Sequence, residues 1–134
     1  MKIDPYLHFN GNCAEAIALY EKAFNAKASH IMKYSETPAK EGYIPPPGTE
    51  NWLGHATLPI GDTGLMLCDV PEMGCNFGNG VSLHVTMDNI DSAKAAFEIL
   101  KEGGEVGMEL QKTFWSECFG SLIDKFGVGW MLSV

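Results

Sequence analysis

Hydrophobic and polar positions follow the same order twice along the chain. Residues 3–69 and residues 81–134 each predict a strand, a helix and then three more strands. The copies end alike, on Gly64-Leu65-Met66-Leu67 and Gly129-Trp130-Met131-Leu132, and their helices superpose on a shift of 77 residues. A repeat of this length is too long for a solenoid unit and too short for two independent domains. We therefore predict a single α+β domain, residues 1–134, in which two βαβββ modules share one core and a cleft.

The two helices are predicted from apolar residues at helical spacing and from the residues that begin and end them. The first should span residues 13–24, with Asn12 as N-cap, Glu15 completing a capping box and Asn25 ending it. The second should span residues 92–102, with Asp91 as its cap and glycines after its last turn.

Runs rich in β-branched and aromatic residues predict the strands. They are residues 3–9, 28–34, 52–60, 65–69, 81–87, 105–110, 118–124 and 128–134. Between the second and third strands, residues 35–51 contain Pro38 and Pro45-Pro46-Pro47, which exclude a helix or a central strand. We expect an extended surface arm there, either a functional lid or a solvated insertion.

The composition of the chain narrows the classes of molecule that it could bind. The net charge of -8, with only nine basic residues, argues against a nucleic-acid surface, and no apolar run is long enough for a membrane helix. The first residues are too polar for a signal peptide, which predicts a cytoplasmic protein. The four cysteines lack metal-ligand spacing, so we interpret them as reduced thiols. We predict no nucleic-acid or membrane partner.

Several stretches resemble the vicinal-oxygen-chelate superfamily, which includes glyoxalase I, extradiol dioxygenases and bleomycin-resistance proteins. The similarity to its PhnB-like branch rests on four stretches: residues 5–12 with 14–16, Ile60-Gly61-Asp62 before Leu65-Met66-Leu67, residues 113–120, and Asp124-Lys125-Phe126-Gly127-Val128-Gly129-Trp130-Met131. The resemblance implies the glyoxalase/bleomycin-resistance fold over essentially the whole chain. It also implies a small-molecule site in the cleft and a homodimer.

The resemblance also implies where a metal would bind. Metal-using relatives place one His, Gln or Glu ligand on the first and last strand of each module. Those positions fall here on Pro5, Met66, Ser82 and Met131. We therefore predict no metal and no other cofactor. The alternative is a divalent metal displaced to His55 and His84; His8 is expected to face the helix.

Strand alternation then predicts the wall of the cleft. The expected lining residues are Leu7, Phe9, Met66, Cys68, Ser82, His84, Thr86 and Met131, with His55 and Trp115 closing the site. This is an apolar wall with a few polar groups, which is typical of a small-molecule site. The two methionines also fit as core residues, and Trp115 as a packing residue between modules or subunits. His84 is the only candidate general base.

Three functions are compatible with these residues. The first is a metal-free protein that binds a small aromatic or hydrophobic molecule, and the second is a lyase, isomerase or dioxygenase that uses the displaced metal. The third is a protein with a closed cleft that acts only through assembly. We predict no methyl transfer, because the only dense glycines, residues 103–107, follow a helix instead of a strand. The identity of the ligand and the presence of any catalysed reaction stay open.

Overall fold

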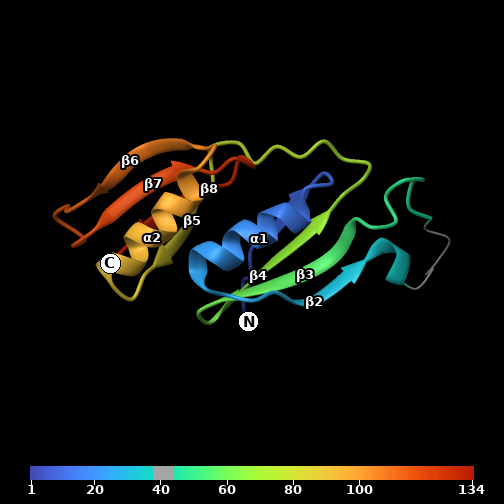
Figure 1. The fold of residues 1–134 in the computed structure, drawn as a ribbon, viewed down its shortest axis with the longest axis horizontal. Helices are drawn as coiled ribbons and strands as arrows, with labels where there is room; N and C mark the ends of the chain where they lie inside the picture. Colours follow the sequence, from blue (N-terminus) through green and yellow to red (C-terminus); the bar gives the residue numbers. More distant parts are fainter. Residues whose placement is uncertain (38–43) are drawn as a thin grey trace. The chain divides into compact units, whose positions relative to one another are not determined.

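The protein, as a computed structural model, is described over residues 1–37 and 44–134. These residues form two compact units, Met1–Cys75 and Asn76–Val134, and each unit contains one copy of the predicted repeat (Figure 1). That the copies share a core and a cleft stays a prediction. Part of the predicted arm, including Pro38, lies outside the described residues, and Pro45 and Pro46 have no regular structure.

The first unit is one helix on a four-stranded mixed sheet. Its elements are β1 (Tyr6–Phe9), α1 (Cys13–Phe24), β2 (Ser29–Lys33), a 3-10 turn η1 (Tyr34–Glu36), β3 (Leu53–Ile60) and β4 (Thr63–Asp69). The strand order is β1-β4-β3-β2; β1 runs parallel to β4, and the other neighbours are antiparallel. Ile60 pairs with Thr63, so the β3–β4 hairpin turns on Gly61-Asp62, and Gly61 supplies the positive φ of 56°.

The second unit repeats this arrangement. Its elements are β5 (Leu83–Thr86), α2 (Ile90–Lys101), β6 (Glu105–Gln111), β7 (Phe119–Ile123) and β8 (Gly129–Ser133). The strand order is β5-β8-β7-β6, with β5 parallel to β8. The α+β fold with two βαβββ modules is confirmed. No helix in the described part of the chain is long and apolar enough to cross a membrane.

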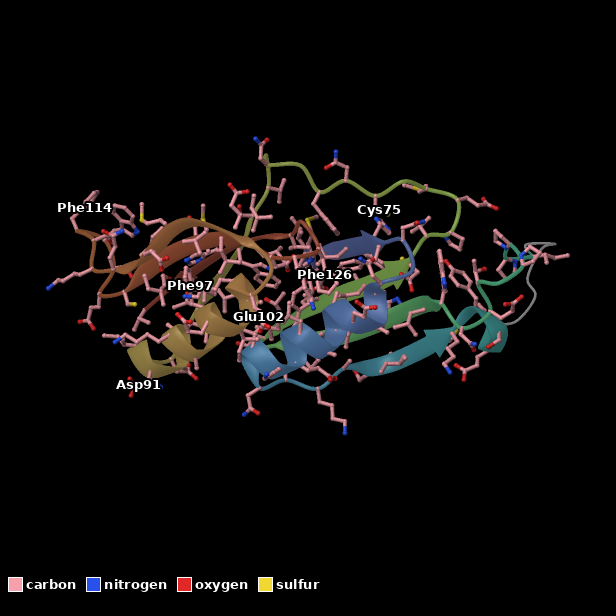
Figure 2. The ribbon with its side chains drawn as sticks, turned by 45° about the horizontal axis from the view of Figure 1, so that its top comes forward. Cys75, Asp91, Phe97, Glu102, Phe114 and Phe126 are labelled. Atoms are coloured by element: carbon pink, nitrogen blue, oxygen red, sulfur yellow. The ribbon has the colours of Figure 1, made fainter. Side chains whose placement is uncertain are left out.

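Each helix buries one apolar stripe against its own sheet (Figure 1). In α1 the stripe includes Ala16, Ile17 and Tyr20, and in α2 it includes Ala96 and Phe97. The alanines let the helix backbone approach the strands, while one large aromatic in each helix fills the space that remains. Figure 2 shows Phe97 between α2 and its sheet, where its ring would touch a side chain placed at Gly120. Burying such a ring contributes roughly 3 kcal/mol.

The helix bounds are predicted well and Asn12 does occupy the N-cap position of α1, but the predicted side-chain cap is wrong in both helices. Helix α1 spans the predicted residues, yet the Asn12 side chain makes no capping hydrogen bond. Instead, Asp69 Oδ1 at the end of β4 accepts from Gly11 N at 2.8 Å and Cys13 N at 3.1 Å. In α2 the cap is Asn89, whose Oδ1 accepts from Ser92 N at 2.8 Å, and Asp91 lies inside the helix. A carboxylate from a distant strand is invisible to a local capping pattern.

Candidate binding faces of the two sheets

One face of each sheet is not covered by its helix, and we call it the helix-free face. In β1 the exposed and buried residues alternate: Tyr6 and His8 are exposed, whereas Leu7 and Phe9 are buried in the core with exposures of 8% and 1%. The prediction that Leu7 and Phe9 line the cleft while His8 faces the helix is therefore wrong. Leu7 and Phe9 pack on the helix side, and His8 lies on the helix-free face, because the apolar positions follow the helix.

The helix-free face of the first unit carries two rows of side chains across three strands. Tyr6 pairs with Met66, which pairs with Thr57. The next row contains His8 and its partner Cys68. By continuation of the same register, His55 lies beside Cys68 on β3. Three of the predicted site residues, His55, Met66 and Cys68, thus share one face with three that were not predicted, Tyr6, His8 and Thr57.

Hydrogen bonds link the polar groups on this face. Tyr6 reaches over β4, and its hydroxyl lies 2.9 Å from His55 Nδ1. His55 Nε2 lies 3.2 Å from Thr57 Oγ1, so both imidazole nitrogens are engaged. Tyr6 also stacks on His8, with ring centroids 5.1 Å apart. The face is therefore a connected network and not a set of free metal donors.

Burial favours the protonated forms of Tyr6 and Cys68 in this network. Desolvation raises the pKa of Tyr6 to about 12, so the phenol keeps its proton at neutral pH. Desolvation likewise raises the pKa of the Cys68 thiol, although its hydrogen bond with Tyr6 acts in the opposite direction. In the His55 tautomer that carries its proton on Nε2, Nδ1 accepts from the Tyr6 hydroxyl and Nε2–H donates to Thr57 Oγ1. Cys68 is a protonated, buried thiol, and none of the four cysteines is in a disulfide.

The helix-free face of the second unit has the same layout with different chemistry. His84 pairs with Met131, which pairs with Ser121, and Thr86 pairs with Ser133, which pairs with Phe119. His84 Nε2 lies 2.9 Å from Ser133 Oγ. Of the predicted residues, His84, Thr86 and Met131 therefore lie together on this face.

The strand register corrects one predicted equivalence. The prediction treated Pro5 and Ser82 as equivalent positions beside Met66 and Met131. In the structure the residue opposite Met66 is Tyr6, and the residue opposite Met131 is His84. The helices superpose on a shift of 77 residues, but the first strands superpose on 78, because the second copy has one residue less between strand and helix. Extending the pairing of Leu83 with Trp130 places Ser82 beside Gly129.

The metal implied by the superfamily does not fit these donors. Beside the central methionines stand a phenol that retains its proton, Tyr6, and a single imidazole, His84. Thioethers are soft ligands, whereas Zn²⁺, Ni²⁺ and Fe²⁺ sites are built from imidazole, thiolate and carboxylate. In residues 1–37 and 44–134 no three His, Cys, Asp or Glu side chains gather as a metal-binding group. We derive no step that passes through a metal.

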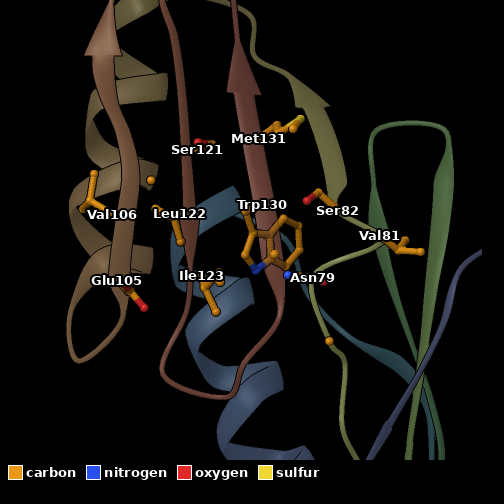
Figure 3. A pocket seen from close by; sticks show the side chains of 13 residues that line it. Asn79, Val81, Ser82, Glu105, Val106, Ser121, Leu122, Ile123, Trp130 and Met131 are labelled. Atoms are coloured by element: carbon orange, nitrogen blue, oxygen red, sulfur yellow. The ribbon is translucent and has the colours of Figure 1, made fainter.

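A hollow of about 260 Å³ lies on the helix-free face of the second unit (Figure 3). It is lined by Gly78, Asn79, Val81, Ser82, Glu105, Val106, Gly107, Ser121, Leu122, Ile123, Gly129, Trp130 and Met131. Its floor includes Gly129, between Ser82 and Ile123. Ser82 and Met131, both predicted site residues, thus line one concavity.

Trp115 lies in the β6–β7 connection. Its ring makes an edge contact with Phe119, 5.4 Å between centroids, and another with Phe114 at 4.7 Å. Figure 2 shows Phe114 at the outer end of this connection, where it is 97% exposed. Phe119 pairs with Ser133 in the second row of the helix-free face, so Trp115 borders that face.

Comparison with known proteins agrees with this architecture. The profile of the Glyoxalase/Bleomycin resistance protein/Dioxygenase superfamily matches residues 2–132. The chain therefore belongs to this superfamily, and the resemblance inferred from the sequence is confirmed. Protein YjdN of Escherichia coli is 31% identical over 140 residues, covering 100% of this chain and 95% of the relative.

Two solved structures extend the comparison. Protein PA1353 from Pseudomonas aeruginosa is 34% identical with a TM-score of 0.85, covering 99% of this chain and 96% of that one. A PhnB protein from Bacillus cereus, named as a candidate 3-demethylubiquinone-9 3-methyltransferase, is 30% identical with a TM-score of 0.80, covering 99% and 98%. Both sheets are mixed, with one parallel and two antiparallel strand pairs each.

Proposed function

We propose that this protein binds a small organic molecule on the helix-free faces of its sheets without a bound transition metal. The observation that carries the proposal is the methionine at the centre of each face. Met66 has Tyr6 and Thr57 as its neighbours, and Met131 has His84 and Ser121. A flexible thioether surrounded by hydroxyl and imidazole groups suits an uncharged organic ligand better than a cation.

The first-unit network supports a binding role over a metal-dependent reaction. His55, the donor required by the displaced-metal alternative, already uses both nitrogens, with Tyr6 at 2.9 Å and Thr57 at 3.2 Å. A metal would have to displace one of these partners, and the remaining neighbours are a protonated phenol and a buried thiol with a raised pKa. Such a network holds side chains in one arrangement, which is how a binding face is preorganised.

Metal content is the first test of the proposal. Protein purified without chelator or affinity tag is expected to contain less than about a tenth of an equivalent of any transition metal, since the described residues offer no group of three His, Cys, Asp or Glu ligands. Elemental analysis measures this content directly. The untagged protein is also dialysed against Zn²⁺ or Ni²⁺, and the bound metal is measured again.

Two variants make this test specific to the displaced site. If a stoichiometric metal is found and either His55→Ala or His84→Ala abolishes it, the metal-dependent alternative is correct and the proposal fails. The His30→Ala variant is the matched control, because the His30 imidazole is exposed and its Nδ1 lies 3.0 Å from Oγ of the adjacent Ser29.

We also propose that the chain forms a homodimer, as its superfamily resemblance implies. Strand β2 supports this assembly: it is an exposed sheet edge that carries Ile31 and Met32, which are 52% and 39% exposed. Light scattering at micromolar concentration is expected to give about twice the chain mass of 14.6 kDa. A mass equal to one chain would contradict the dimer and leave the binding proposal in place.

A further inference from the structure

We infer that the hollow at Gly129 is the subsite for an uncharged, single-ring aromatic group that carries an oxygen substituent. The inference rests on the proposed function and deepens it, because it assigns the ligand class and the residues that select it. It is drawn from the shape of the floor, the state of the hydroxyl groups, the charge of the lining and the volume.

Glycines create the floor of the hollow. Gly129 occupies a central strand between Ser82 on one side and Ile123 on the other, so one position of that row has no side chain. A Cβ placed there would lie 2.9 Å from Ser82 Oγ. Gly107 has the same relation to Ser121, whose Oγ would lie 2.9 Å from the added Cβ. Both φ angles lie outside the left-handed region, so backbone conformation does not require glycine at either position.

The two serine hydroxyls are free to bind a ligand. In the described chain neither Ser82 Oγ nor Ser121 Oγ hydrogen-bonds to another residue. The first-unit face differs, because Tyr6, His55 and Thr57 already bond to one another. The serines lie on opposite sides of β8, two strand spacings of about 4.8 Å apart across the sheet and two residues apart along it, because Ser82 lies beside Gly129 and Ser121 beside Met131. They therefore flank a ring that lies on the floor, and each can donate to a ligand oxygen.

The lining excludes an anion. Of the thirteen residues around the hollow none is Lys, Arg or His, and Glu105 is the one charged side chain. A ligand carboxylate or phosphate would meet Glu105 without a compensating cation in a protein of net charge -8. A carbonyl or hydroxyl oxygen carries no such penalty and still accepts from the serines.

Volume and surface chemistry indicate a single ring. A cavity of about 150 Å³ suffices for benzene, so about 260 Å³ accommodates one ring with a short substituent. Met131 and Ile123 supply apolar contact at the sides, and a thioether interacts favourably with an aromatic ring. Figure 3 shows these side chains and Ser82 around the hollow.

The probes for the test differ in one feature each. Acetophenone is a benzene ring with an uncharged carbonyl substituent. Ethylbenzene lacks the oxygen, and benzoate carries a negative charge. Amide chemical shifts in ¹H–¹⁵N spectra of the full chain report both affinity and place. Acetophenone is expected to shift the amides of Gly129, Ser121 and Met131, with a dissociation constant on the order of 1 mM. Ethylbenzene and benzoate are expected to bind about tenfold more weakly.

Variants separate the hydroxyls from the floor. The double variant Ser82→Ala/Ser121→Ala is expected to weaken acetophenone about tenfold and leave ethylbenzene unchanged, since only the oxygen loses its donors. Gly129→Ala should weaken both probes, because its methyl group fills the hollow. The matched control is Gly74→Ala, whose added Cβ meets nothing within 4 Å and whose φ is not positive. The unliganded spectrum of each variant verifies its fold.

Three results would overturn the inference. In the first, acetophenone shifts the amides around Tyr6 and His55 and not those of the hollow; the proposed function then stands and the subsite is wrong. In the second, benzoate binds as tightly as acetophenone. In the third, no probe shifts the amides of the hollow. Failure of the proposed function itself has a separate signature, a stoichiometric metal that depends on His55 or His84.

Discussion

Replacing Asp69 with alanine is expected to lower the free energy of unfolding by about 3 kcal/mol, through the loss of a buried carboxylate that satisfies three backbone donors. Asp69 is 2% exposed. Its Oδ1 accepts from Gly11 N and Cys13 N at the start of α1, and its Oδ2 accepts from Leu53 N at 3.0 Å at the start of β3. Alanine removes the acceptor of all three N–H groups, and those of Cys13 and Leu53 are buried. Equilibrium urea unfolding, followed by far-UV circular dichroism, measures the change.

Two further variants make the Asp69 prediction specific. Asp69→Asn keeps one acceptor oxygen but turns an NH₂ group toward a donor, so an intermediate loss of about 2 kcal/mol is expected. Glu72→Ala, an exposed acid three residues away, should stay within about 0.5 kcal/mol of the parent. A loss of less than about 1 kcal/mol for Asp69→Ala would mean that water replaces the carboxylate.

Replacing Asp124 with alanine is expected to have a comparable effect in the second unit, again about 3 kcal/mol. Asp124 is 3% exposed and joins the β7–β8 turn to the core. Its Oδ1 accepts from Phe126 N at 2.8 Å and Val128 N at 3.1 Å, and its Oδ2 accepts from Trp130 Nε1 at 2.9 Å. Without the carboxylate, the turn loses two side-chain hydrogen bonds, and the indole N–H loses its bond to Asp124. Urea unfolding measures the loss, with the exposed Asp88→Ala as control.

A double-mutant cycle isolates the indole bond of Asp124. Trp130→Phe removes the donor, so the cost of Asp124→Ala should be smaller in the Trp130→Phe background by about 1 kcal/mol or more. Strict additivity of the two substitutions would show that the bond between Asp124 and Trp130 contributes nothing to stability.

These two aspartates show what local patterns miss. The sequence predicted that the Asn12 side chain caps α1, because an Asn before an apolar helix is a common N-cap. In the structure the capping hydrogen bond to Cys13 N comes from Asp69, 56 residues further along the chain. Nothing near Asp69 marks it as a cap, since its partners meet only when β4 ends beside the helix. Its position at the end of a predicted strand was the only available signal.

Some residues of the candidate site were also predicted from the sequence, and others were recognised only in the structure. The sequence identified His55, Met66, Ser82, His84 and Met131, because they are the polar and sulfur-containing residues in otherwise apolar strands. It missed Tyr6, His8, Thr57 and Ser121. Tyr6 was missed because the alternate residues Leu7 and Phe9 of β1 were assigned to the binding face. A shift of one position along a strand exchanges its two faces. Ser82 was matched to the wrong position of the first copy for a related reason. The connection between the first strand and the helix is one residue shorter in the second copy.

By itself, the sequence determined the repeated βαβββ order, the bounds of α1, the hairpins and the superfamily. These depend on periodicity, turn residues and residue identity, which are local properties. Tertiary structure alone decided which face of β1 packs on α1, which residues pair across the strands, that Tyr6 bonds to His55, and that a glycine leaves a hollow beside Ser82. These depend on which distant strands meet and in what register, and sheet register is fixed by packing of the whole core.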